Sequence, residues 1–330
     1  AGIKGCEVYR SDDAGKTWKL TNNKLPQAFS TYGYYFAKIY VSPTNADKIV
    51  VLGVNAWLST DAGKTFKNID GRNVHSDHHA LWINPKRDSH MINGNDGGLN
   101  ITYDNGVNWF KANSPAVGQY YAIAVDDAQP YNVYGGFQDN GTWFGPSNNR
   151  ETSDWHDSGN YPFKSIGGGD GMQVQVDTRD NTTVYVGSQF GAYSRLNRNA
   201  PFAGRVSVRP QHELGDKPLR FNWQSPILLS KHNQDVFYFG SNRFHRSFNK
   251  GENSVNLSGD LTGGKKEGNV PFGTLVTMSE SPLRFGLIYT GSDDGYVYIT
   301  KDGCTTWTNI TPAGLQECLI NAIEVSPHDK

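Results

Sequence analysis

The hydrophobic residues of the chain recur in short runs that alternate with polar and glycine-rich segments. One run ends in Ser-Pro or a similar turn and a second apolar run follows it, as in AKIYVSP and DKIVVLG. Runs of the first kind are centred on Val41, Ile83, Val125, Val176, Leu228, Val276 and Val325, and by subtraction their separations are 42, 42, 51, 52, 48 and 49 residues. Four-stranded propeller blades repeat at about 40–50 residues. The pattern therefore predicts an all-β fold, a β-propeller of about seven four-stranded blades.

Six of the predicted blades are complete, and they span residues 36–70, 78–112, 119–160, 170–208, 223–260 and 273–310. The seventh is composite or incomplete, because residues 1–20 supply a third and a fourth strand while residues 319–330 supply a first strand. Either the two ends meet and close a single propeller over 1–330, or the chain is an internal fragment of a longer protein with further propeller domains. The missing second strand favours the fragment.

The three cysteines allow one further expectation about the composite blade. Cys6 and Cys318 would lie together in it, and a disulfide between them is one hypothesis. Three unrelated thiols, with Cys304 as the third, are the alternative.

A second pattern, the Asp box Ser/Thr-x-Asp-x-Gly-x-Thr-Trp, follows the third strand of several repeats. Its copies contain Asp13, Asp61 and Asp104, and a variant around Asp302 carries Cys304 where glycine is expected. Ser/Thr and Asp side chains can hold the amides of a tight turn, and glycine accepts a positive φ. The aromatic residue packs between blades. We assign these aspartates a structural role, because four similar turns would otherwise be four active sites.

The loops on the other face of a propeller are the better candidates for function. Loops that enter the first strands share this channel face with the links between second and third strands, and here they are polar, glycine-rich and unlike one another. We expect a ligand to bind there, at Asp77, His78, His79, Tyr120, Gln138, Asn140, Gln189, Trp223, Arg243 and Asp293.

Three carboxylates on this face, those of Asp96, Asp139 and Asp170, have two possible roles. Glycoside hydrolysis needs two carboxylates about 5–9.5 Å apart, whereas Asp also caps glycine turns routinely. A metal at Asp77, His78 and His79 is disfavoured, because neighbouring residues of a strand point to opposite sides. We expect no metal and no cofactor.

Charge and hydropathy exclude two classes of partner. The 31 basic and 32 acidic residues give a formal net charge of −1, so nothing favours capture of nucleic acid. No apolar run approaches the roughly 20 residues of a membrane-spanning helix.

Several phrases together resemble a known family. YRSDDAGKTW, WLSTDAGKTF, SDHHALWINP, GNDGGL, QDNGTW, GGGDGMQV and FNWQSPILLS are similar to the bacterial sortilin/Vps10-type repeat proteins, over nearly the whole chain. The resemblance implies a secreted, periplasmic or cell-surface protein with further blades. More distantly the repeats are similar to twin-propeller xyloglucanases, whose catalytic aspartates match no motif here.

Two functions follow as expectations. The first is a secreted propeller that recognises a glycan or a peptide at its channel face. The second is a glycoside hydrolase that acts on a β-glucan through paired carboxylates in a cleft shared with a second propeller.

Overall fold

The computed structural model describes residues 7–22, 37–112, 118–150, 161–264, 272–314 and 318–328, together with residues 152, 154 and 158. The described strands form seven consecutive antiparallel sheets, six with four strands and one with two. This confirms the predicted fold class, an all-β chain of propeller blades. No described helix is long and apolar enough to cross a membrane. The chain divides into two compact units, unit 1 (Ala1–Val117) and unit 2 (Gly118–Lys330), and each is described by itself.

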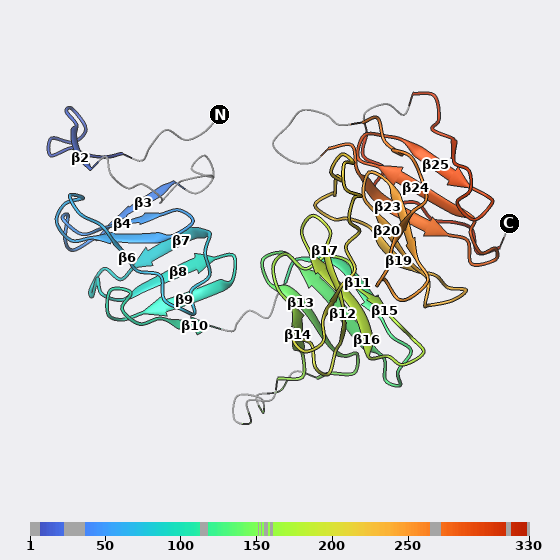
Figure 1. Ribbon diagram of the computed structural model, residues 1–330. Coiled ribbons are helices and arrows are strands. Elements are labelled where there is room, and N and C mark those ends of the chain that lie inside the picture. The colour runs from blue at the N-terminus through green and yellow to red at the C-terminus, as the bar shows by residue number, and fades with distance from the viewer. Residues whose placement is uncertain are drawn as a thin grey trace. The chain divides into compact units, whose positions relative to one another are not determined.

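Unit 1 contains three sheets (Figure 1). The first is two-stranded, and the other two have their four strands in chain order. Their strands are β1 (Val8–Arg10), β2 (Lys19–Asn22), β3 (Lys38–Val41), β4 (Ile49–Leu52), β5 (Ala56–Ser59), β6 (Lys67–Asn68), β7 (His78–Ile83), β8 (Met91–Asn95), β9 (Gly98–Thr102) and β10 (Phe110–Ala112).

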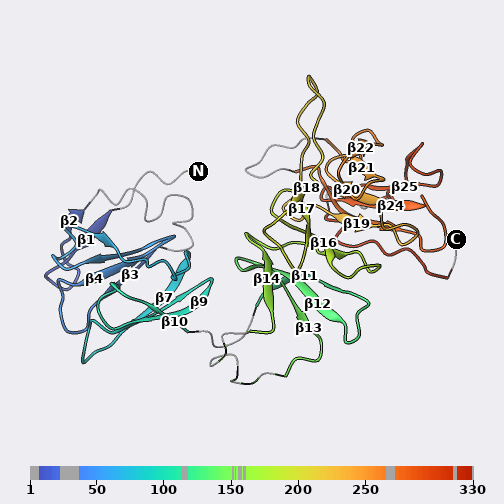
Figure 2. The same ribbon diagram turned by 60° about the horizontal axis from the view of Figure 1, so that its bottom comes forward.

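Unit 2 contains four sheets, again with four strands each in chain order (Figure 2). Their strands are β11 (Tyr120–Val125), β12 (Asn132–Phe137), β13 (Gly141–Pro146), β14 (Lys164–Gly167), β15 (Gln175–Val176), β16 (Thr183–Ser188), β17 (Ala192–Asn197), β18 (Val206–Ser207), β19 (Ile227–Leu229), β20 (Phe237–Gly240), β21 (Phe244–Ser247), β22 (Val255–Asn256), β23 (Leu275–Glu280), β24 (Ile288–Ser292), β25 (Val297–Thr300) and β26 (Thr308–Asn309).

Apolar side chains fill the space between successive sheets. All four residues of β4 are buried, which is typical of a strand covered on both faces. Between β3–β6 and β7–β10, the second strands contribute Leu52 and Met91 to one core cluster. In unit 2, Tyr185 of one sheet stacks on Phe237 of the next with ring centroids 4.6 Å apart. Aromatic second strands thus hold neighbouring blades together.

The inner strands are also joined edge to edge by side-chain amides. Gln173 Oε1 accepts a hydrogen bond from Ile227 N at 3.0 Å, and Gln175 Oε1 accepts one from Leu229 N at 3.3 Å. These bonds satisfy backbone groups of β19 that have no partner strand on that side. An exposed edge of this kind invites pairing with other chains, and the glutamines occupy it.

One sheet continues past its predicted, approximate blade boundary. The blade expected at residues 119–160 has β14 (Lys164–Gly167) as its fourth strand, and residues 147–163 separate this strand from β13. Polar residues such as those in SNNRETSD carry no strand pattern, so the sequence did not reveal how far the fourth strand was displaced.

The predicted composite blade joins parts of both units and stays a prediction. Residues 318–328 contain no strand. Ile320 N donates to Ser292 O at 3.1 Å, as Leu275 N donates to Ser241 O at 2.7 Å at the start of β23. Ile320 therefore occupies the place beside the β23–β26 sheet that Leu275, at the start of β23, occupies beside the β19–β22 sheet. Cys318 is a free thiol, and Cys6, the other half of the hypothetical bridge, lies outside the described residues.

Candidate functional site

The Asp-box turns share one hydrogen-bond pattern. In the turn after β5, Asp61 Oδ1 accepts from Ser59 Oγ at 2.8 Å and from Thr65 N at 2.9 Å, while Oδ2 accepts from Thr65 Oγ1 at 2.6 Å. These bonds favour the ionised carboxylate and lower the pKa of Asp61 to about 2. Equivalent bonds lower the pKa of Asp13 and Asp302 to about 2 and that of Asp104 in the same direction. The carboxylates of these aspartates therefore stabilise their own turns.

Two consecutive residues of each turn have positive φ. The pairs are Ala14–Gly15, Ala62–Gly63, Asn105–Gly106, Lys250–Gly251 and Gly303–Cys304. In the Asp302 turn the glycine has moved to the first position, so Cys304 takes the second with φ 76°. Burial raises the pKa of the Cys304 thiol to about 12, which leaves it protonated and unreactive.

The box tryptophans bond to the preceding sheet. Trp109 Nε1 donates to Ile69 O at 2.7 Å, and Trp307 Nε1 donates to Leu257 O at 3.0 Å. Ile69 and Leu257 each follow the fourth strand of the sheet before. Trp18, in the first box, is 62% exposed and donates to Gly15 O of its own turn.

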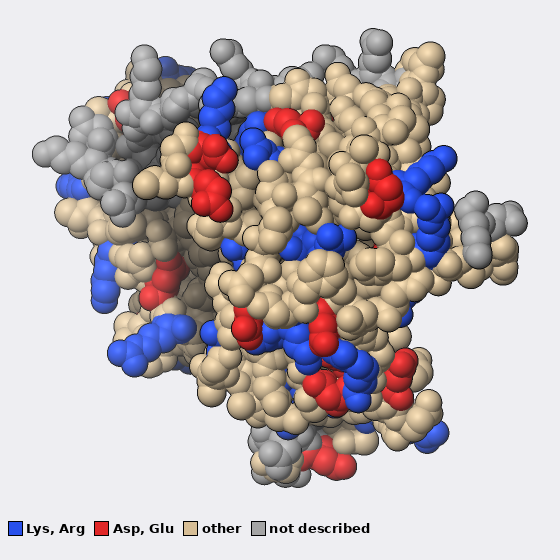
Figure 3. Space-filling view, turned by 45° about the vertical axis from the view of Figure 1, so that its right-hand side comes forward, with Lys and Arg blue, Asp and Glu red and all other residues tan. Residues whose placement is uncertain are grey.

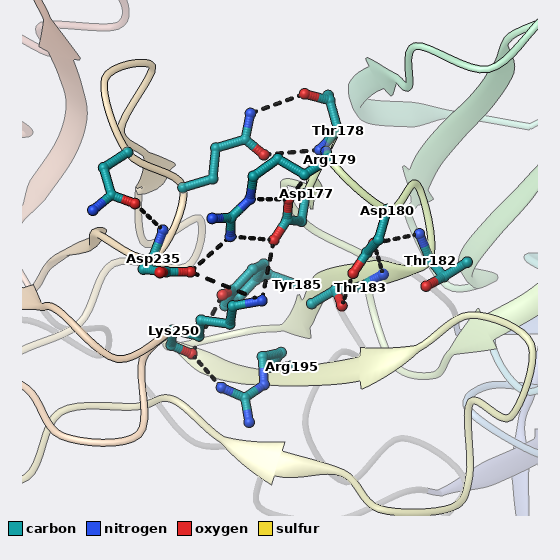
Figure 4. Close-up of polar contacts among 12 residues, drawn as sticks. Asp177, Thr178, Arg179, Asp180, Thr182, Thr183, Tyr185, Arg195, Asp235 and Lys250 are labelled. Carbon is teal, nitrogen blue, oxygen red and sulfur yellow. Dashed lines mark hydrogen bonds and ion pairs between the residues drawn. The ribbon is translucent and has the colours of Figure 1, made fainter.

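Ion pairs link the blades near these turns (Figure 4). Arg179 lies between Asp177 and Asp235, with its Nη2 at 2.7 Å from both carboxylates. Asp177 is buried, and the Arg179 hydrogen bonds are the main cause of its lowered pKa. Lys250 Nζ lies 3.4 Å from Asp177. This cluster joins β15–β18 to β19–β22 and has a structural role.

On the channel side of unit 1 the predicted histidines have different environments. His78 is fully buried, with Nδ1 at 3.0 Å from Asn93 Oδ1 and Nε2 at 3.1 Å from Asp70 Oδ1. His79 is partly exposed, and its Nε2 lies 2.5 Å from Asp96 Oδ1. The two rings therefore do not converge on one point, as their neighbouring positions in the strand predicted.

A buried polar cluster surrounds His78. Asp70 accepts from Asn55 Nδ2 at 2.8 Å and Ala56 N at 3.1 Å, and Asn95 Nδ2 donates to Asn100 Oδ1 at 2.9 Å. Asp77, with φ 64°, accepts from Ser76 Oγ at 3.1 Å. Buried polar groups of this kind need their partners, so His78 acts within the fold rather than as an exposed ligand contact.

In unit 2 the structure brings Asp139, Asp170 and Gln189 together. Asp170, which is 5% exposed, accepts a hydrogen bond at Oδ1 from Asp139 N at 2.8 Å. Asp170 N donates to Gln189 Oε1 at 3.3 Å. Asn140 Nδ2 donates to Gln138 O at 3.0 Å. The Asp170 carboxylate thus caps the β12–β13 turn, while the Asp139 side chain is only partly buried.

Aromatic side chains lie beside these carboxylates. Trp223 is 39% exposed, its Nε1 donates to Tyr121 Oη at 3.3 Å, and its ring meets Phe190 edge-on at 5.2 Å. Tyr121 Oη donates to Gln138 Oε1 at 3.1 Å. Burial, followed by the charges of Asp170 and Asp139, raises the pKa of Tyr121. These contacts fix the orientation of the half-exposed Trp223 indole beside the polar groups of Tyr121 and Gln138.

Tyr120 presents a second exposed ring. It is 46% exposed and lies on Phe137, with ring centroids 4.1 Å apart. A Cβ on Gly135 would lie 2.2 Å from the Tyr120 ring, so the glycine leaves the space that this ring occupies.

The remaining predicted residues lie around the next two sheets. Asp293 accepts from Gly273 N, Thr274 N and Thr274 Oγ1 at 3.0, 2.9 and 2.6 Å. The Asp293 carboxylate thus ties the β24–β25 link to the segment that enters β23. Arg243 is partly exposed, and its charge adds to the burial that lowers the pKa of His245 to about 4.

Sequence reasoning missed Tyr121 and Phe190. A register shift between Tyr120 and Ala122 makes Tyr121 a bulge residue, and the same shift occurs between His78 and Ala80. Bulges re-aim side chains and recur beside functional sites. His79 and Tyr121 occupy equivalent positions of HHALWI and YYAIAV. An alignment of the two repeats on His79 would therefore have identified Tyr121 as a candidate.

Comparison with known proteins confirms the predicted resemblance over part of the chain. Residues 6–141 match the family model described as sortilin, neurotensin receptor 3. No curated protein matches the sequence.

The solved structures that are similar to the chain include two GH74 enzymes. One is the GH74 enzyme of Niastella koreensis, with a TM-score of 0.30 and 10% identity over 94% of this chain and 62% of that one. The other is the GH74 xyloglucanase from Xanthomonas campestris, with a TM-score of 0.37 and 14% identity over 90% of this chain and 49% of that one. The chain thus spans less than two thirds of either.

Proposed function

We propose that the protein is a secreted recognition module that binds a glycan chain at the channel face of unit 2. The observation that carries the proposal is the pair of oriented, half-exposed rings, Trp223 and Tyr120, beside the polar groups of Gln138, Asp139 and Asn140. Sugars offer apolar C–H faces and a girdle of hydroxyl groups, and such a ligand matches aromatic platforms with convergent polar groups.

Pre-organisation supports binding at this place. The Trp223 indole is held by Tyr121 and Phe190, and the Tyr120 ring is held on Phe137. Because these rings are already ordered, little side-chain entropy is lost when a ligand stacks on them. The match to a family described by a receptor name favours recognition over catalysis, and it favours a protein exposed to the outside of the cell.

Charge also suits a neutral ligand. Lys and Arg are interspersed with Asp and Glu on the face seen in Figure 3, and the formal net charge is −1. Neither feature would concentrate a polyanion. A glycan without charged groups therefore fits better than an acidic polymer.

Calorimetric titration with xyloglucan oligosaccharides and cello-oligosaccharides tests the proposal. We expect saturable binding that weakens at least about tenfold in Trp223→Ala, which corresponds to about 1.4 kcal/mol. Phe202→Ala is the matched control, since Phe202 is 77% exposed on a different loop of unit 2. Absence of binding to a broad glycan array, or binding to a peptide array instead, would overturn the proposal that the ligand is a glycan.

A glycoside hydrolase is the second candidate, because Asp139 and Asp170 are neighbours: the Asp139 backbone N donates to Asp170 Oδ1 at 2.8 Å, and the Asp139 carboxylate is only partly buried. One carboxylic acid would protonate the leaving oxygen and the other carboxylate would act as base or nucleophile. Asp170→Asn keeps the Oδ1 acceptor of the turn and removes the charge. Release of reducing sugar from a β-glucan that is abolished in this variant would establish the hydrolase, and unchanged release would exclude Asp170 from catalysis.

A further inference from the structure

Tyr121 connects the exposed indole of unit 2 to an amide side chain beside it. Trp223 Nε1 donates to Tyr121 Oη at 3.3 Å, and Tyr121 Oη donates to Gln138 Oε1 at 3.1 Å. The three residues come from separate parts of the unit. Tyr121 is the bulge residue of β11, Gln138 follows β12, and Trp223 lies in the segment before β19. We call these three side chains the Tyr121 relay.

The Tyr121 relay has one direction. An indole N–H can only donate, so Trp223 occupies a lone pair of the phenolic oxygen and leaves the phenolic proton for Gln138. Burial is the main cause that raises the pKa of Tyr121 above its usual value, so the phenol keeps this proton at neutral pH. An amide oxygen accepts such a proton and an amide nitrogen does not. Tyr121 therefore sets the orientation of the Gln138 amide.

This orientation leaves the amide nitrogen of Gln138 without a protein acceptor. Gln138 is partly exposed, and no hydrogen bond joins its Nε2 to another residue in the described part of the chain. Its two N–H groups can therefore donate to a ligand. Because the indole and the amide contact the same phenolic oxygen, they are close enough to contact one sugar residue.

Packing explains the ring of Tyr121 but not its hydroxyl group. The ring packs against the core cluster that contains Phe221 and Phe239, and a phenylalanine would fill this place equally well. The Tyr185 hydroxyl, in the next sheet, bonds to a backbone carbonyl, that of Lys250. Both bonds of the Tyr121 hydroxyl instead join side chains of the candidate site. The hydroxyl group thus orders the site rather than the core.

We propose that Tyr121 is a positioning residue of the glycan site, and that through it Gln138 donates a hydrogen bond to an oxygen atom of the sugar stacked on Trp223. This inference rests on the proposed function and adds a direction to the recognition, since the protein donates here and the sugar accepts. A site whose side chains are ordered before the ligand arrives loses little entropy on binding.

Calorimetric titration of Tyr121→Phe with xyloglucan oligosaccharides and cello-oligosaccharides tests the role of the hydroxyl group. The variant keeps the packed ring, and we expect binding at least about fivefold weaker, the loss typical of one hydrogen bond. Tyr131→Phe is the matched control, because Tyr131 is 47% exposed and precedes β12, whereas Gln138 follows it. It should bind as the parent does. Equal affinities of the two variants would overturn the proposal.

A change of donor at Gln138 tests the direction of the bond. Gln138→Glu keeps an oxygen acceptor for Tyr121 but has no donor when ionised, so we expect binding at least about tenfold weaker at pH 7. A protonated carboxyl group donates again, and its usual pKa is about 4.3. Affinity relative to the parent should therefore recover as the pH falls from 7 to 4. Gln138→Met has no donor at any pH and should stay weak.

This recovery would not occur if Gln138 only filled space. Binding by Gln138→Glu that equals that of the parent at pH 7, or that does not recover in acid, would overturn donation by Gln138.

The indole N–H resonance of Trp223 tests the Tyr121 relay without a ligand. Its absence from the spectrum of Trp223→Phe identifies it. In Tyr121→Phe the indole loses its acceptor, so we expect the resonance to shift and to exchange faster with solvent, while Tyr131→Phe leaves it unchanged. An unchanged resonance in Tyr121→Phe would overturn the relay even if glycans bind. A shifted resonance in a protein that binds no glycan would overturn the proposed function instead.

Discussion

Gly106 and Gly303 both have positive φ, yet they occupy different places in the Asp-box turn. Gly106 is the second left-handed residue, and an added Cβ would lie 2.8 Å from Ile69 Cβ. Gly303 is the first, a place that Ala14 and Ala62 occupy in other turns, and its Cβ would meet nothing within 4 Å. Of these two glycines, only Gly106 therefore combines left-handed strain with a clash.

We expect Gly106→Ala to lower the free energy of unfolding by about 2–4 kcal/mol, from left-handed strain plus overpacking. Gly303→Ala should cost less than about 1 kcal/mol. Urea denaturation measures both. Equal losses would contradict this expectation, because they would show that the contact with Ile69 adds nothing to the cost of left-handed strain.

Acid should weaken the Asp-box turns. The pKa of Asp61 is lowered to about 2 in the fold, against about 3.9 when unfolded. Its contribution is therefore present above the unfolded pKa and is lost as the pH falls through about 2. The same sign holds for Asp13 and Asp302, whose pKa values are also about 2.

The expected result is a thermal midpoint that falls between pH 4 and pH 2, less steeply in Asp61→Asn than in the parent. Asn249 shows that the amide is compatible with this turn, since its Oδ1 accepts from Ser247 Oγ at 2.7 Å and Asn253 N at 3.0 Å. Asp61→Asn should therefore be milder than Asp61→Ala at pH 7. If Asp61→Asn has the same pH profile as the parent, protonation of Asp61 does not contribute to the loss of stability in acid.

At the scale of the element, the box tryptophan joins one sheet to the one before. Trp109→Phe removes the bond to Ile69 O and leaves a small gap, so we expect a loss of about 1–3 kcal/mol in the free energy of unfolding. Trp18→Phe is the matched control, because Trp18 is 62% exposed, and should cost less than about 0.5 kcal/mol. Denaturant titration of both variants decides whether the bond matters.

The sequence predicted the elements unevenly. First and second strands were clear, because apolar runs such as IVVL in β4 are buried on both faces. Fourth strands such as β6 and β22 have two residues each and carry no pattern. Bulges at His79 and Tyr121 depend on strand register, which periodicity does not encode. For this reason the sequence did not separate the buried residues of the predicted site, such as His78, from the exposed ones, such as Trp223.

At the scale of the whole molecule, the sequence repeat predicted the number of sheets and their order. It did not predict which residues of neighbouring blades are in contact. The Arg179 cluster combines residues more than 50 positions apart, as in its bond to Asp235 at 2.7 Å. No local spacing marks such a pair. The division into two units likewise depends on which sheets bury each other.

The Arg179 cluster should stabilise the fold mainly by compensating the charge of buried Asp177. In Arg179→Met the Asp177 carboxylate, 1% exposed, keeps Lys250 at 3.4 Å as its cation among the described residues (Figure 4). We expect a loss of about 1–3 kcal/mol in the free energy of unfolding at pH 7, because a buried charge that loses its nearer cation is costly. Asp235→Asn should cost less than about 1 kcal/mol, since the Asp235 side chain is 42% exposed.

The pH dependence gives the sign of this effect. Arg179 lowers the pKa of Asp177 in the fold, so the pair stabilises above the unfolded pKa and loses its effect in acid. The difference between parent and Arg179→Met should therefore shrink as the pH falls below about 4. A difference that stays constant down to pH 2 would assign the loss to packing of the arginine stem.

The tryptophan bonds have a direction. Trp109 and Trp307 each reach back to the sheet made just before their own, at Ile69 and Leu257. When the chain leaves the ribosome, the acceptor carbonyl is thus already exposed when its tryptophan emerges. At these two tryptophans, each new sheet can therefore close on a sheet that has already been synthesised.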